Sequence, residues 1–143
     1  MKFFKTTIAV LVFLFACSFS FSQEMKAEKY ENPQWVSISY IKFKPMKKGP
    51  AMSIIENYFA KADQDAGIDP PVAYNFPMGK YDMMVIWDME DGIETLNWKT
   101  TPGDVKWMES MSKIAGGQDK AMAKLDEFMT YVEAWENTMA RRE

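Results

Sequence analysis

The chain has 143 residues, with 17 basic against 20 acidic side chains and a formal net charge of −3, so it lacks the basic surface that nucleic-acid binding requires. It contains no histidine, which excludes a Ser-His-Asp triad, histidine-ligated haem and nearly all catalytic zinc sites. Any chemistry would depend on carboxylates, tyrosines, lysines or a bound group, and the sequence carries no cofactor-binding motif, so we expect no cofactor.

Residues 1–22 have the pattern of a secretory signal peptide. Two lysines precede an apolar run over residues 8–16, which is shorter than the roughly 20 residues of a membrane span. Ser20 and Ser22 provide the small residues at positions −3 and −1 of a cleavage site before Gln23. The sequence therefore predicts a secreted or periplasmic protein without a membrane span, and loss of the two lysines takes its net charge from −3 to −5.

An alternative N-terminus is that of a lipoprotein. Leu14-Phe15-Ala16-Cys17 resembles a bacterial lipoprotein box, in which the cysteine is lipidated and becomes the first residue, although the bulky Phe15 fits that pattern poorly. Cys17 is the only cysteine, so cleavage near Ser22-Gln23 would leave no disulfide, thiolate nucleophile or cysteine metal ligand. Such a domain must be held together by its own core or by a partner.

The mature chain is expected to begin with a flexible leader over residues 23–33, which is polar and has no apolar period. A single α+β domain over residues 34–143 follows. Residues 35–43 are rich in β-branched and aromatic side chains, which predicts a strand. Apolar residues occur at both odd and even positions of this strand, so we expect both of its faces to be covered. The odd positions are Trp35, Ile41 and Phe43, and the even positions are Val36, Ile38 and Tyr40.

A helix is expected from Pro50 to about Gly67, because proline suits a first helical turn and glycine suits a helix end. Its apolar stripe consists of Met52, Ile55, Phe59, Ala62 and Ala66.

Two strands, residues 72–78 and 83–87, lie close enough in sequence to pair as a hairpin. Pro77 cannot donate a ladder hydrogen bond and places the first of them at a sheet edge. The second is an unbroken apolar run, which is typical of a central strand covered on both faces.

The long segment from Asp91 to Val132 is expected to be mostly helical. Asp91 and Glu94 have the spacing of a capping box that opens a helical turn, and Thr101 caps a helix that ends at Gly116-Gly117. A further helix begins near residue 118. The positions expected to face the core are Val105, Met108, Met111, Ile114, Ala115, Met122, Leu125, Phe128 or Met129, and Val132.

Residues 131–142 fit either a continuing helix or a strand, and we favour a strand within residues 133–141 because the fold requires one. The resulting order is the ferredoxin-like βαββαβ plan, with an antiparallel sheet and helices on one face. The first and third strands are central in this plan and the second is an edge. Since the other sheet face is also apolar, the pattern predicts that a second copy of the chain covers it, as in a dimeric α/β barrel.

Residues 34–141 resemble the dimeric α/β-barrel superfamily, which includes antibiotic-biosynthesis-type monooxygenases and stress-responsive barrel proteins. The resemblance rests on the element order, the two-faced strands and the stretch Tyr81-Asp82-Met83-Met84-Val85-Ile86-Trp87-Asp88-Met89-Glu90, which leads into a capped helix. The segment between this stretch and the last strand departs from the family, because it is longer than the usual second helix.

The resemblance implies a pocket between sheet and helices that is lined by tyrosine, tryptophan and asparagine. Such a lining suits a small hydrophobic or aromatic ligand. The alternative is that these residues are ordinary core and interface aromatics. The candidate ligand-binding residues are Tyr40, Tyr74, Asn75, Trp87, Trp98 and Trp107.

No metal site is expected. The methionines fall on the apolar stripes without an accompanying histidine, which indicates packing rather than Cu(I) binding. The spacing of Asp63, Asp65, Gly67 and Asp69 departs from that of an EF-hand loop.

No converging set of reactive residues is present, and no catalytic residue can be assigned. The sequence favours an exported homodimeric domain with a non-enzymatic binding or structural role. The alternative is a cofactor-independent monooxygenase-like enzyme acting on a small aromatic or hydrophobic molecule, which depends on analogy of fold.

Overall fold

The computed structural model describes residues 25–142, so the expected signal peptide, its cleavage site and Cys17 lie outside the described residues. Residues 25–31 contain no helix or strand. From Asn32 onward the chain forms one unit. Among the described residues no helix is long and apolar enough to cross a membrane.

The unit contains one four-stranded antiparallel sheet of strand order β2-β3-β1-β4. Its strands are β1 (Gln34–Phe43), β2 (Val72–Asn75), β3 (Met83–Asp88) and β4 (Val132–Arg142). The predicted βαββαβ plan is confirmed, including the edge position of β2, its hairpin with β3 and the final strand. β2 is shorter than predicted and stops before Pro77, which has no N–H to donate to a ladder.

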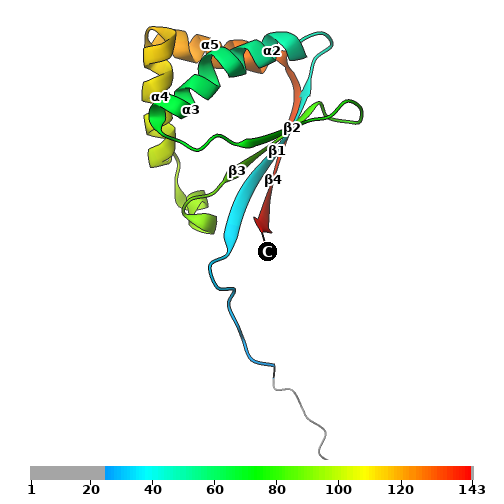
Figure 1. Ribbon diagram of the computed structural model, residues 1–143, viewed down its shortest axis with the longest axis vertical. Coiled ribbons are helices and arrows are strands. Elements are labelled where there is room, and N and C mark those ends of the chain that lie inside the picture. Colours follow the sequence, from blue (N-terminus) through cyan, green and yellow to red (C-terminus); the bar gives the residue numbers. More distant parts are fainter. Residues whose placement is uncertain (1–24, 143) are drawn as a thin grey trace, which may run out of the picture. The chain divides into compact units, whose positions relative to one another are not determined.

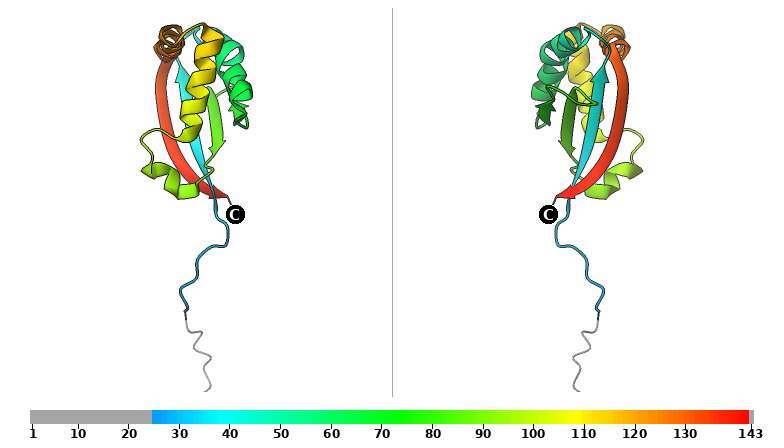
Figure 2. Two further views of the ribbon diagram at one scale, coloured as in Figure 1. Left: turned by 90° about the vertical axis from the view of Figure 1, so that its left-hand side faces the viewer. Right: turned by 90° about the vertical axis from the view of Figure 1, so that its right-hand side faces the viewer.

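The helices lie on one face of this sheet, as the two side views in Figure 2 show. They are α2 (Lys48–Ile54), the π-helical turn η1 (Ile55–Phe59), α3 (Ala60–Ala66), the 3-10 helix η2 (Gly92–Asn97), α4 (Pro102–Ala115) and α5 (Gln118–Tyr131). Figure 1 labels the longer helices, α2 to α5, beside the strands.

The main core forms where α2 and α5 pack on β1 and β3. Successive side chains of a strand point to opposite faces, so the odd-numbered residues of β1 and β3 face the helices. The buried residues of this core are Ile41, Phe43, Ala51, Ile54, Met83, Val85 and Phe128. Phe128 contacts Phe43 edge to face, with ring centroids 6.2 Å apart, and thereby anchors α5 to the sheet.

A second, smaller core joins the three helices α3, α4 and α5. It consists of Ala62, Met111 and Ala121, all fully buried. Two alanines allow the helix backbones to approach closely, and the flexible thioether of Met111 fills the remaining space. Phe59 and Trp107 pack against this core with ring centroids 5.7 Å apart.

The predicted helix over residues 50–67 is interrupted by the π turn η1 in its middle. The turn adds one residue to a helical period, so the residues before and after it meet the core in different registers. Ala62 and Phe59 face the core as predicted, but the most buried positions before the turn are Ala51 and Ile54 rather than Met52. Gly67 ends the helix in the left-handed conformation (φ 67°), as predicted.

The long segment after β3 differs from the prediction at two points. Asp91 makes no side-chain cap, and η2 is a 3-10 helix, so the first capping box is absent. Thr101 and Asp104 do form a reciprocal capping box at the start of α4. Val105 and Met122 are about half exposed, because Met111 and Phe128 take the core-facing positions of α4 and α5. Of the two predicted alternatives, Phe128 and Met129, it is Phe128 that is buried.

We expect Met111→Ala to lower the free energy of unfolding by about 2–5 kcal/mol, because it leaves a cavity where three helices meet. The matched control is Met122→Ala on α5, whose side chain is 44% exposed and whose loss should cost less than about 1 kcal/mol. Chemical denaturation checks both, and equal losses in the two variants would show that the helices are not held through Met111.

Candidate functional site

The sheet face that carries no helix is largely apolar. The even-numbered residues of β1 face this side, and the strand register places their neighbours on the same side. In the right-hand view of Figure 2 the strands lie in front of α4 and no helix covers them. Val36, at the end of this face, is already buried within the single chain. The apolar residues of this open face are Val36, Ile38, Tyr40, Val72, Tyr74, Met84, Ile86, Ala134 and Ala140.

Ion pairs border the open face. Lys42 pairs with Glu133 at 2.7 Å, Lys80 with Glu136 at 2.9 Å and Arg142 with Asp88 at 3.2 Å. Each pair joins two segments that are far apart in the sequence. The border therefore carries equal numbers of positive and negative side chains, whereas the centre of the face is apolar.

The β2–β3 loop contributes one end of the open face. Tyr81 packs against Tyr40 with ring centroids 5.3 Å apart, and the Lys80 ammonium lies 4.7 Å from the centre of the Tyr81 ring. Hydrogen bonds to Tyr81 and Glu136 raise the pKa of Lys80. The corresponding bonds from Tyr81 and Lys80 lower the pKa of Glu136, so this ion pair stays charged at neutral pH.

The helix-facing side of β1 and β4 carries a polar cluster that the sequence analysis missed. Ser39 is buried and donates a hydrogen bond of 2.6 Å to the Asn137 carbonyl oxygen Oδ1. The indole N–H of Trp135 donates to Asn137 Oδ1 at 2.7 Å and to Ser39 Oγ at 3.1 Å. These bonds satisfy polar groups beside the core and fix the position of β4 on β1. No signal in the sequence marks them before the register is known.

The six predicted ligand-binding residues do not come together in one place. Tyr40 and Tyr74 lie on the open face of the sheet, and Trp87 packs into the main core on the opposite face. Asn75 ends the edge strand β2, and Trp98 is exposed just after η2. A ligand-binding role for these residues stays a prediction.

The last of the six, Trp107, belongs to α4. It packs against the second core and donates a hydrogen bond to Asp63 of α3. Burial raises the pKa of Asp63, and this bond offsets part of the increase. These contacts give Trp107 a structural role in joining α3 to α4.

A polar groove lies on the helical side of the protein, away from the open face. It has a volume of about 580 Å³. The groove lies between the α2–η1 segment and α5, and Ile114 of α4 contributes to one end. Its lining consists of Pro50, Ser53, Ile54, Asn57, Tyr58, Lys61, Ile114, Lys124, Glu127 and Tyr131.

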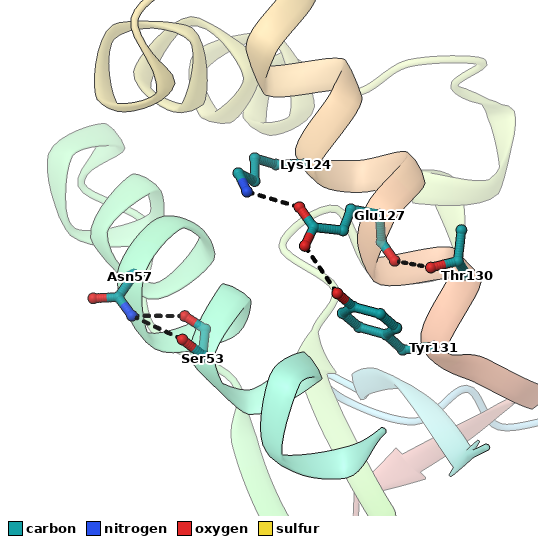
Figure 3. A network of polar contacts seen from close by, with 6 residues as sticks. All are labelled: Ser53, Asn57, Lys124, Glu127, Thr130 and Tyr131. Atoms are coloured by element: carbon teal, nitrogen blue, oxygen red, sulfur yellow. Dashed lines mark hydrogen bonds and ion pairs between the residues drawn. The ribbon is translucent and has the colours of Figure 1, made fainter. Parts of the chain in front are cut away.

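Glu127 is the centre of a hydrogen-bond network in this groove. Figure 3 shows Lys124 and Tyr131 reaching its carboxylate from opposite ends along α5. The Lys124 ammonium lies 2.7 Å from Oε2, and the Tyr131 hydroxyl donates to Oε1 at 2.9 Å. Both bonds favour the ionised carboxylate, and they lower the pKa of Glu127. The same contacts raise the pKa values of Lys124 and Tyr131.

Cations also lie against the two tyrosine rings of the groove. Lys124 is 5.2 Å from the centre of the Tyr58 ring, and Lys47 is 5.4 Å from the centre of the Tyr131 ring. These contacts hold both rings in place. Within residues 25–142, no group of three or more carboxylate, cysteine or histidine side chains could hold a metal ion.

Solved structures with the same fold are known. A NIPSNAP family protein from Agrobacterium tumefaciens matches with a TM-score of 0.51 at 12% identity, over 82% of this chain and 93% of that one. A second NIPSNAP family protein of that organism, of unknown function, has a TM-score of 0.50 at 11% identity, over 81% and 94%. A dimeric ferredoxin-like protein from an uncultured marine organism has a TM-score of 0.49 at 9% identity, over 78% and 90%.

No protein-family model matches the chain, and no curated protein sequence matches it. The structural likeness confirms the predicted α+β, ferredoxin-like class of fold. At 12% and 11% identity it is a likeness of fold and not of function.

We expect Tyr131→Phe to raise the pKa of Glu127, because the carboxylate loses a donor that favours its charged form. The carboxyl ¹³C shift of Glu127 followed during an acid titration measures this directly. The ion pair with Lys124 stabilises the fold above the pKa of Glu127 in the unfolded chain, and this contribution is lost as the pH falls through the folded-state value. In Tyr131→Phe that loss should begin at higher pH.

The control for this titration is Tyr74→Phe on the open face, which should leave the Glu127 titration unchanged. If the Glu127 pKa is the same in Tyr131→Phe and in the unmodified chain, the hydroxyl does not bond to the carboxylate in solution.

Proposed function

We propose that the protein is an exported homodimer with a non-enzymatic binding or structural role, and that its two copies pair through the open face of the sheet. The observation that carries the proposal is the apolar open face itself. Val72 and Tyr74 are exposed there and the residues at its centre are half-buried in the single chain. An apolar patch that stays accessible to this extent marks an interaction site in soluble proteins. Ile38 and Ile86 lie at its centre, opposite each other on β1 and β3.

The size of the open face supports a second copy as its partner. The strands have 10, 11, 6 and 4 residues, which at about 3.3 Å per residue and 4.8 Å between strands gives a footprint of about 500 Å². Accessible surface exceeds such a flat projection. A standard interface buries about 800 Å² on each partner, so the face is of the right order for a dimer.

The charges at its border also favour self-association. Each lysine or arginine there is already paired with a carboxylate of the same chain. The border therefore has no excess of one sign, and a second copy could approach it without like-charge repulsion. A sheet-on-sheet dimer would bury the apolar centre and leave these ion pairs at the rim.

The dispersal of the aromatic residues supports a binding or structural role over an oxygenase. Tyr40 and Trp87 lie on opposite faces of the sheet, and Trp107 packs among the helices. Residues so separated cannot converge on one substrate within one chain.

Export is part of the same proposal, and its support is the sequence pattern of residues 1–22. We expect the protein recovered from the producing cell to begin at Gln23, which intact-mass spectrometry would show. A mass that corresponds to a chain beginning at a lipidated Cys17 would replace the secreted form by a membrane-anchored one. An N-terminus at Met1 would contradict export altogether.

We expect Tyr74→Glu to convert the dimer to a monomer, because it places a charge on the apolar face that pairing would desolvate. The Tyr74 side chain is 51% exposed in the single chain, so the substitution should leave the monomer folded. The matched control is Val105→Glu on α4, where the side chain is 50% exposed on the helical side. Sedimentation equilibrium should show a shift in mass for Tyr74→Glu alone.

Two results would refute pairing through this face. One is a monomeric unmodified chain at micromolar concentrations. The other is an equal change of mass in both variants, which would indicate a general effect of added charge.

A further inference from the structure

The groove between the α2–η1 segment and α5 combines a concave shape with an unusual backbone feature. Its 580 Å³ volume lies within the range of small-molecule sites. Asn57 and Tyr58 reach it from the π turn η1. Such turns are rare in α-helices and are frequent at functional sites. The turn here is not caused by proline or glycine, since neither occurs in its sequence Ile-Glu-Asn-Tyr-Phe.

The charges of the groove favour an anionic ligand. The lining contains two lysines, Lys61 and Lys124, and one carboxylate, Glu127. Both oxygens of Glu127 are engaged, one by Lys124 and the other by the Tyr131 hydroxyl. Among residues 25–142 Lys61 forms no ion pair with a carboxylate. Its ammonium therefore supplies a positive charge in the groove that these residues do not balance.

The groove also offers apolar contacts beside these cations. Ile54 is buried at its wall, and Ile114 lies at the end that α4 contributes. The ring of Tyr58 is held in place by Lys124. A ligand that fits must therefore combine an anionic group for Lys61 with an apolar body for these side chains.

We infer that this groove is a binding site for a small organic acid, in which Lys61 binds the carboxylate and Ile54, Ile114 and the Tyr58 ring contact the apolar part. The intact Lys124–Glu127–Tyr131 network keeps Glu127 from repelling the ligand, because its charge is already compensated. The site lies on the helical side, so it requires neither the proposed dimer nor export.

The test uses the chain from Gln23 to Glu143 and three probes, with ¹H–¹⁵N spectra recorded during each titration. Benzoate carries both required groups, benzamide has the same ring without the charge, and inorganic phosphate has charge without a ring. We expect benzoate to shift the amide signals of Asn57, Lys61 and Lys124 in a saturable manner. Benzamide and phosphate should each bind at least about tenfold more weakly, since each lacks one of the two contacts.

Three variants identify the residue responsible. Lys61→Ala should raise the Kd for benzoate about tenfold, because it removes a charge-assisted hydrogen bond. Lys61→Arg should largely restore binding. Lys106→Ala, which removes an exposed lysine from α4 outside the groove, should leave the Kd unchanged.

Three outcomes would overturn the inference. They are phosphate binding as tightly as benzoate, equal Kd values for Lys61→Ala and Lys106→Ala, and benzoate shifts confined to the open face of the sheet. A failure of this kind in a chain that remains dimeric would leave the proposed function intact, because the dimer is tested by its mass and the groove by its ligand.

Discussion

The structure depends on a strand that is apolar on both faces but covered by its own chain on only one. Ile41 and Phe43 of β1 are buried under α2 and α5, whereas Ile38 and Tyr40 point to the side without helices. Hydrophobic burial is the main driving force of folding. Within a single chain the open face contributes less of it than the helix-facing side, because Ile38 and Tyr40 are only half-buried. The proposed dimer would bury this second face as well.

The helical layer holds the long segment between β3 and β4 against a small sheet. Met111, with Ala62 and Ala121, joins three helices into one layer, and Phe128 anchors that layer to β1. The π turn lets one helix serve both cores by changing its register in the middle. It also places Asn57 and Tyr58 beside α5, so the groove is a consequence of the way in which the helices pack.

Much of this fold could be predicted from the sequence, because its strands carry strong local signals. The two-faced runs of β1 and β3, and Pro77, which was predicted to lie inside the edge strand, agreed with the ferredoxin-like order. The final strand was predicted only because that plan requires one. The π turn could not be predicted, since its sequence contains neither proline nor glycine. The exposure of Val105 and Met122 was also missed, because periodicity identifies an apolar stripe but not which of its residues lies deepest in the core.

Candidate sites were harder to predict than elements. The six candidate ligand-binding residues share a chemical type, but the sheet places two of them, Tyr40 and Trp87, on opposite faces. The groove residues come from α2, η1, α3, α4 and α5, and their common feature is proximity in space. In the sequence alone, Lys61 and Glu127 resemble other charged residues of a helix surface, and only the packing of the helices shows that they line one groove.

The central claim is that the uncovered sheet face is where two copies meet. Isotope-filtered NOE spectra of a mixture of ¹³C-labelled and unlabelled chains test it most directly. The account predicts intermolecular NOEs to the side chains of Ile38, Met84 and Ile86 on the open face. NOEs confined to residues of the helical side, such as Val105 and Met122, would contradict it and would require a different interface.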